Sequence, residues 1–198
     1  MEPLSWLRVP ERDTLPDTVQ NLFDKAEEKL GHIPNVFNVF SLTPEHFMRW
    51  FKYYDFLLRN EESPLSRKER EMVALAVSAE NRCEYCLASH SAYLREITGD
   101  PAFPDKVIHN FRRAPLNDRE RAMLEFAAKM TRNSAEMSPA DLEPLRKLGF
   151  SDEAIFELAQ VAAMFNFTNR LANALGWKPN EHYYHVHRDK KEPEPISD

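Results

Sequence analysis

Apolar residues recur every three or four positions along most of this chain, which is the spacing of one buried face of an α-helix. No segment alternates apolar and polar residues for long enough to predict a strand. The pattern therefore predicts an all-α protein of about 8–10 helices. The expected helices cover residues 16–30, 43–58, 67–80, 83–97, 105–112, 117–130, 138–149 and 151–175, with a short turn or helix at 33–40.

Two of the predicted helix starts carry the same capping signature. Ser66 and Glu69 form an S-x-x-E capping box, and Asn117 and Glu120 repeat its spacing. The surrounding stretches, residues 65–71 and 116–122, are also alike in sequence. Either an internal duplication of a helical hairpin or two independently good N-caps would produce this similarity.

The length and composition are those of a folded globular protein. With 198 residues the chain is long enough for one domain with a sizeable core. Hydrophobic residues make up 42% and charged residues 29%, which is not the composition of a disordered chain. We predict a single helical domain over residues 1–178 and a polar tail over residues 179–198, which holds His182, His185 and His187.

Charge and glycine content exclude several classes of function. The net charge is −6 and no basic stripe is present, so we expect no nucleic-acid partner. Only 4 glycines occur and neither the dinucleotide nor the P-loop fingerprint is found, so we expect no cofactor. No apolar run approaches the roughly 20 residues that span a bilayer, and the first residues lack a basic region followed by an apolar stretch. We therefore expect no membrane association, no secretory signal and a cytoplasmic location.

The only two cysteines of the chain lie close together in a predicted helix. Cys83, Cys86 and His90 are spaced i, i+3 and i+7, which places all three side chains on one helix face. The helix N-terminus favours a thiolate, and His90 is near enough to exchange a proton with a thiol. A disulfide between Cys83 and Cys86 would close too small a loop to stabilise a domain, so their pairing would serve chemistry.

Glu71 adds a carboxylate to this group. It lies on the preceding helix and would reach the cysteines and His90 if the two helices pack as a hairpin, where it could accept a proton. Structural zinc is an alternative, although it needs two further ligands and the later histidines fit no zinc-finger spacing. Haem attachment is excluded because Leu87, and not a histidine, follows the second cysteine.

Other polar residues leave their roles open. Tyr85, between the cysteines, either donates a hydrogen bond or packs. Asn166, Asn169 and Arg170 interrupt a buried pattern, and they either line a cavity or serve an interface.

The spacing of Glu71, Cys83, Cys86 and His90 resembles the E-x(11)-C-x-x-C-x-x-x-H signature of the alkylhydroperoxidase D-like proteins, which belong to the carboxymuconolactone decarboxylase superfamily. Residues 65–71, 149–153 and 165–170 are similar to its peroxidase-related branch. The resemblance covers roughly residues 20–178. It implies an all-helical fold that assembles as a homo-oligomer, with a dimer, trimer or hexamer as the alternatives, and it requires no metal at the thiol site.

The same resemblance implies roles for the site residues. Cys86 would be the peroxidatic cysteine, Cys83 its resolving partner, and Glu71 with His90 the proton relay. Tyr85 departs from the best-known members, which have a histidine directly before the second cysteine.

These roles predict a thiol peroxidase. It would reduce hydroperoxides and be restored by an external dithiol that is lipoamide-like or thioredoxin-like. A non-enzymatic redox sensor or interaction protein is one alternative. A lactone decarboxylase on the same fold is another, but that chemistry needs no dithiol.

Overall fold

The computed structural model describes residues 3–188, and within them every regular element is a helix, which confirms the predicted all-α fold class. Nine α-helices lie in this range, joined by short 3₁₀ turns. The helices are α1 (Asp17–Leu30), α2 (Asn35–Phe40), α3 (Pro44–Arg59), α4 (Arg67–Glu80), α5 (Glu84–Thr98), α6 (Phe103–Asn110), α7 (Asp118–Arg132), α8 (Glu143–Lys147) and α9 (Asp152–Leu175).

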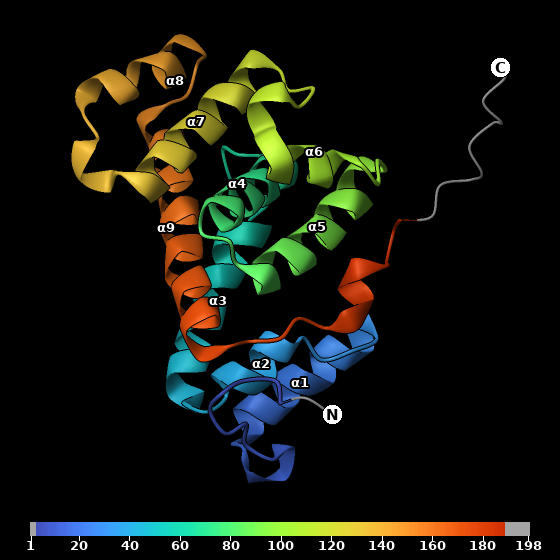
Figure 1. The fold of residues 1–198 in the computed structure, drawn as a ribbon. Helices are drawn as coiled ribbons and strands as arrows, with labels where there is room; N and C mark the ends of the chain where they lie inside the picture. Colours follow the sequence, from blue (N-terminus) through green and yellow to red (C-terminus); the bar gives the residue numbers. More distant parts are fainter. Residues whose placement is uncertain (1–2, 189–198) are drawn as a thin grey trace, which may run out of the picture.

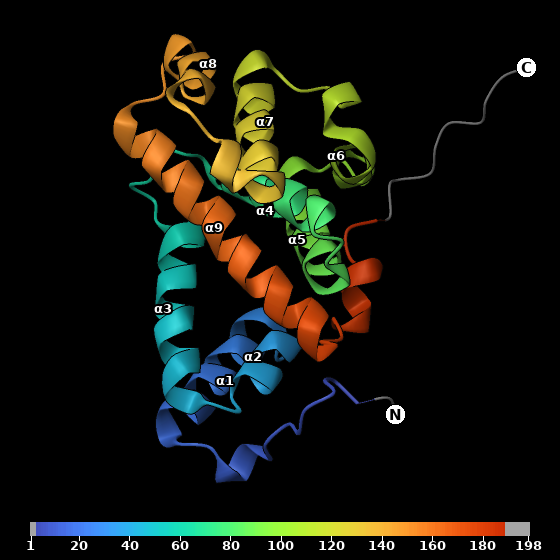
Figure 2. The same ribbon diagram turned by 60° about the vertical axis from the view of Figure 1, so that its left-hand side comes forward.

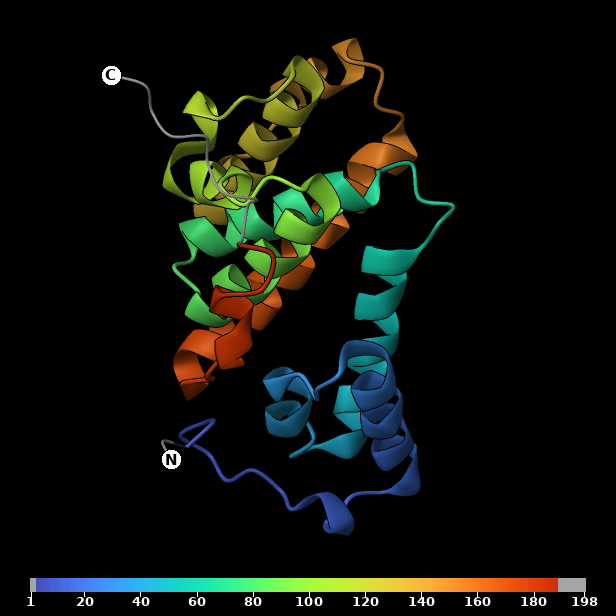
Figure 3. The ribbon, with the colours of Figure 1, turned by 90° about the vertical axis from the view of Figure 1, so that its right-hand side faces the viewer.

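The longest helix, α9, runs diagonally through the molecule and separates two groups of helices (Figure 2). Helices α1, α2 and α3 lie on one side, and α4 to α7 lie on the other (Figures 1 and 3). The most buried helix is α4, whose apolar run from Met72 to Val77 is at most 1% exposed. It packs against α5, α6, α7 and α9, so it forms the centre of the core. No helix among residues 3–188 is both long enough and apolar enough to span a bilayer.

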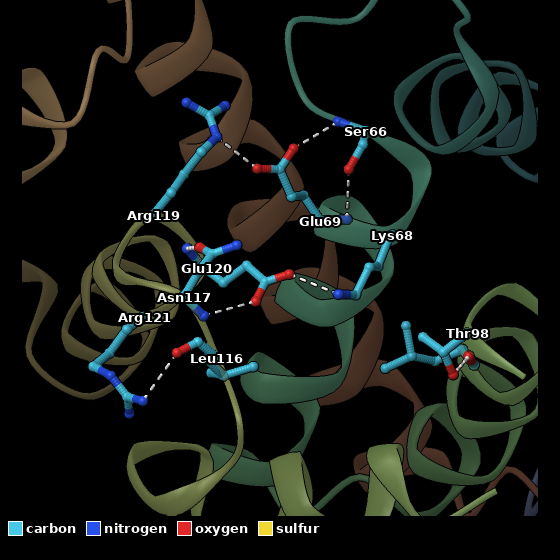
Figure 4. Close-up of polar contacts among 10 residues, drawn as sticks. Ser66, Lys68, Glu69, Thr98, Leu116, Asn117, Arg119, Glu120 and Arg121 are labelled. Carbon is cyan, nitrogen blue, oxygen red and sulfur yellow. Dashed lines mark hydrogen bonds and ion pairs between the residues drawn. The ribbon is translucent and has the colours of Figure 1, made fainter. Parts of the chain in front are cut away.

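Both predicted capping boxes are present (Figure 4). At α4, the Ser66 hydroxyl accepts from the N–H of Glu69 at 3.2 Å, and the Glu69 carboxylate accepts from the N–H of Ser66 at 2.8 Å. At α7, Asn117 and Glu120 make the equivalent pair of bonds at 2.8 and 3.1 Å. The two helix starts are therefore fixed by local sequence, as the spacing predicts.

The two boxes are also linked to each other by ion pairs (Figure 4). Arg119, in the first turn of α7, donates to Glu69 at 2.7 Å. Lys68, in the first turn of α4, donates to Glu120 at 2.7 Å. The capping glutamate of each helix is thus paired with the basic residue that directly precedes the capping glutamate of the other helix. A reciprocal contact of this kind fits two copies of one unit, although the duplication itself stays a prediction.

The chain beyond α9 returns over the domain and packs against α5 (Figure 1). The buried guanidinium of Arg95 donates to the carbonyl of Tyr183 at 2.5 Å and to that of Val186 at 2.9 Å. Tyr183 is 2% exposed. Residues 179–188 of the predicted tail are therefore packed on α5 through the buried Tyr183, while the domain boundary at residue 178 stays a prediction. Residues 189–198 of that tail lie outside the described residues.

Candidate active site

The turn between α4 and α5 places the first cysteine at a helix start. The N–H of Cys83 donates to the carbonyl of Ser78 at 2.9 Å, and the N–H of Arg82 donates to that of Ala79 at 3.1 Å. These two bonds form a Schellman motif, in which Arg82 takes the left-handed conformation with φ of 52°. Cys83 is then the N-cap residue of α5. Only three residues separate the end of α4 from the start of α5, so the turn fixes where α5 begins and therefore where Cys83 and Cys86 lie relative to α4.

The two thiols differ in acidity although they are one turn apart. Both are free and buried. The hydrogen bond from the Cys86 thiol lowers the pKa of Cys83, and the N–H groups of Cys86 and Tyr85 add to this lowering. The pKa of Cys86 is raised well above its usual value, first because Cys86 hydrogen-bonds Cys83 and then because of burial. Cys83 is therefore the thiol that ionises first.

His90 and Glu71 meet in the interior, and they come from different helices. The Nδ1 of His90, on α5, lies 2.6 Å from Oε2 of Glu71, on α4. The two side chains are 4% and 5% exposed. A carboxylate can only accept, so the nitrogen that faces it, Nδ1, is the donor, and Nε2 points away from Glu71. The rings of His90 and Phe165 of α9 pack at an interplanar angle of 89°, with ring centroids 4.6 Å apart.

Cys86 and His90 line the same narrow cavity, whose interior measures about 50 Å³. Cys83 is fully buried and is not part of the cavity wall. Most of the remaining wall is aromatic and comes from both groups of helices and from the returning chain. The aromatic lining residues are Phe37, Trp50, Phe51, Tyr54, Tyr85, Tyr93, Phe165, Trp177 and Tyr183. The cavity therefore suits a small molecule with an apolar body.

Tyr85 packs in the hydrophobic core, which is one of the two sequence-based alternatives, and it also accepts a hydrogen bond. Its hydroxyl oxygen accepts a hydrogen bond from the backbone N–H of Val36 at 2.8 Å. This bond ties the start of α5 to the start of α2. Burial raises the pKa of Tyr85 well above its usual value, so the phenol stays neutral. Tyr85 therefore acts as an acceptor that joins two elements of the cavity wall.

The structure adds polar residues next to the dithiol that sequence reasoning did not connect with it. Asn169 of α9 and Ser78 of α4 are both fully buried, and the Asn169 amide donates to the Ser78 hydroxyl at 3.1 Å. Asn81 donates to the Asn169 oxygen at 3.0 Å. The Asn169 amide lowers the pKa of Cys83 and, together with the Ser78 hydroxyl, acts against the raised pKa of Cys86. The sequence signal was the interruption of a buried helical pattern by Asn166, Asn169 and Arg170.

The C-terminal histidines do not gather into a metal site. His182 packs on His32, with ring centroids 4.0 Å apart, and its pKa is lowered by burial and by His32. His185 is exposed and contacts Glu181. Within residues 3–188, no group of three or more histidine, cysteine, aspartate or glutamate side chains is arranged to hold a metal ion.

Comparisons with known proteins agree with this fold. The model of the carboxymuconolactone decarboxylase family matches residues 44–101. The structure of an uncharacterized peroxidase-related protein with an alkylhydroperoxidase AhpD core, from Ralstonia eutropha JMP134, is 38% identical. It superposes with a TM-score of 0.92 over 96% of this chain and 100% of that chain. An uncharacterized peroxidase-related protein from Silicibacter sp. TM1040 is 43% identical, with a TM-score of 0.90 over 94% and 97% of the two chains.

Among curated proteins, Sestrin-2 of Bos taurus is 24% identical over 154 residues, which are 78% of this chain and 31% of Sestrin-2. The chain spans about a third of the length of the Sestrin-2 proteins that it matches. The two peroxidase-related structures, by contrast, match along nearly their whole length. The chain therefore belongs to the alkylhydroperoxidase AhpD-like proteins of the carboxymuconolactone decarboxylase superfamily.

Proposed function

We propose that this protein is a thiol peroxidase that reduces small hydroperoxides through Cys86, Cys83, His90 and Glu71. One observation carries the proposal. The buried hydrogen bond between His90 and Glu71 orients an imidazole on the wall of the cavity that Cys86 also lines. A thiol and an oriented base on one small cavity are the groups that nucleophilic attack on a peroxide needs.

Cys86 is the attacking residue because it faces the cavity. Its proton passes to Nε2 of His90, while Glu71 holds Nδ1–H and stabilises the imidazolium. The Cys86 sulfur then attacks one oxygen of ROOH, the O–O bond breaks, and His90 returns the proton to the leaving alkoxide. The products are a sulfenic acid at Cys86 and the alcohol ROH.

Cys83 resolves this intermediate. The Cys83 thiol, one helical turn away, attacks the Cys86 sulfur, a disulfide forms, and the sulfenic oxygen leaves as water with the Cys83 proton. An external dithiol of the lipoamide or thioredoxin class then reduces the disulfide and is itself oxidised, which restores both thiols. In the reduced protein the Cys83 sulfur accepts a hydrogen bond from the Cys86 thiol, and this bond breaks when the Cys86 proton passes to His90.

The test is consumption of cumene hydroperoxide with dihydrolipoamide as the reductant. We expect turnover by the wild type and its loss in Cys86→Ser and Cys83→Ser. His90→Ala should lower kcat by about a hundredfold or more, which is the usual contribution of a general base. His185→Ala is the matched control, because His185 is exposed and lies outside the cavity. Full turnover by Cys86→Ser would refute the proposal.

The same assay separates the alternatives. A redox sensor would be oxidised once by peroxide and would stay oxidised in the presence of dihydrolipoamide, which mass spectrometry detects. A lactone decarboxylase would consume a muconolactone substrate with both cysteines replaced by serine. We also propose a homo-oligomer, as the resemblance implies, and light scattering on the purified protein distinguishes a monomer from a dimer, trimer or hexamer.

A further inference from the structure

The asparagine side chains on one face of α9 hold the turn that carries the dithiol. Asn173 donates to the carbonyl of Asn81 at 2.9 Å, and the Asn81 side chain donates to Asn166 and to Asn169 at 3.0 Å each. Asn166, Asn169 and Asn173 are spaced three and four residues apart, so they share one helix face. We call these three residues the asparagine ladder.

The amide orientation of Asn166 is fixed from outside the site. Its Nδ2 donates to the carbonyl of Ala162 at 3.0 Å, and a carbonyl can only accept. Its Oδ1 accepts from the guanidinium of Arg170 at 2.6 Å, and a guanidinium can only donate. Asn81 must therefore approach this oxygen with its NH₂ group.

The orientation of the Asn81 amide in turn fixes the orientation of the Asn169 amide. The same NH₂ group of Asn81 donates to Asn169, so Asn169 presents its oxygen to Asn81 and its own NH₂ group to the other side. There it donates one hydrogen to the Ser78 hydroxyl, whose own hydrogen is already bonded to the carbonyl of Ala74 at 2.7 Å. The second hydrogen has no oxygen acceptor within residues 3–188, and the two sulfurs lie beside the amide.

We propose that Asn169 is a positioning residue that stabilises the thiolate of the dithiol, because Asn81 holds its amide so that only N–H groups face the sulfurs. A donor without a competing acceptor favours a charged sulfur over a thiol. It also favours the reduced dithiol over the disulfide, which carries no charge. This proposal shares one assumption with the proposed function, namely that Cys83 and Cys86 interconvert between a dithiol and a disulfide. It does not require that a peroxide is the oxidant.

The test is the equilibrium between the protein and mixtures of reduced and oxidised dithiothreitol, in which the protein disulfide is reduced as dithiothreitol is oxidised. The measurement is made at pH 8.5, near the pKa of a free thiol. Asn169→Leu removes the donor, and we expect the equilibrium to shift about tenfold toward the protein disulfide, or about 30 mV to a lower potential. Asn169→Asp places acceptors beside the sulfurs and should shift it further in the same direction.

Two further variants separate this role from a structural one. Asn173→Ala removes a bond to the same turn without touching the thiols, so it should lower the melting temperature and leave the potential unchanged. Asn81→Ala frees the Asn169 amide to rotate, and we expect a smaller shift in the direction of Asn169→Leu. The proposal is overturned if Asn169→Asp and Asn169→Leu keep the wild-type potential, or if Asn173→Ala shifts it equally. A wild type without peroxidase turnover would refute the proposed function and leave these differences in potential unaffected.

Discussion

The buried pair of His90 and Glu71 allows a quantitative prediction about stability. His90→Phe leaves a carboxylate without its partner in the interior, which should destabilise the fold by about 3 kcal/mol. Glu71→Leu leaves the imidazole N–H of His90 unpaired, at a cost of about 2 kcal/mol. The double variant replaces both polar groups by apolar groups of similar size, so it should lie within about 1 kcal/mol of the wild type. The two substitutions are therefore expected to be coupled by about 4–6 kcal/mol.

The assay is urea unfolding followed by far-ultraviolet circular dichroism at one fixed protein concentration. For a slope near the upper end of the usual range, about 3 kcal/mol per molar urea, His90→Phe should lower the midpoint by about 1 M. The control is the pair of Glu45 and Arg49, which is one helical turn apart and about three-quarters exposed. Its coupling should not exceed about 0.5 kcal/mol. If the coupling of Glu71 and His90 is as small as that of the control, the hydrogen bond does not contribute to stability and the reasoning is wrong.

Three further predictions concern the α4–α5 turn and its neighbours. In the wild type, the pH midpoint for alkylation, followed for each cysteine by peptide mass spectrometry, should lie lower for Cys83 than for Cys86, because the hydrogen bond between the two thiols lowers the first pKa and raises the second; the reverse order would contradict the assigned acidities. Arg82→Gly should raise the free energy of unfolding by up to about 1 kcal/mol, since glycine takes the left-handed conformation without strain, and a lower melting temperature would contradict this. Tyr85→Phe should lower the free energy of unfolding by about 1 kcal/mol, because the N–H of Val36 loses its acceptor. Thermal unfolding should show a lower melting temperature, and an unchanged melting temperature would contradict this role of Tyr85.

The parts of the fold that were predictable depend on contacts between neighbours in sequence. The capping boxes at Ser66 and Asn117 involve residues three apart, so their signature is complete in a few letters. The helix face that holds Cys86 and His90 follows from helical spacing alone. Glu71 could be added because α4 and α5 are consecutive helices, and consecutive helices usually pack together.

The parts that were missed depend on contacts between distant segments. The bond from Asn169 to Ser78 spans 91 residues, and no local pattern indicates which polar residue of α9 meets which residue of α4. Tyr183 was assigned to a polar tail because its neighbours are polar, but its carbonyl is bonded to Arg95, 88 residues away. The sequence also did not predict which cysteine has the lower pKa, because the order depends on which sulfur accepts a hydrogen bond from the other.

The ion pairs between the two capping boxes also bear on how the chain folds. Lys68 and Glu120 are 52 residues apart, and Glu69 and Arg119 are 50 residues apart, so these contacts form only after a long loop has closed. The first turn of α4, which leads to Glu71, is thus completed by residues that are synthesised well after the dithiol. Contacts of this length raise the contact order, which slows folding. They also join the two halves of the chain into one cooperative unit, so a fragment ending after α5 would lack the partners of both Lys68 and Glu69.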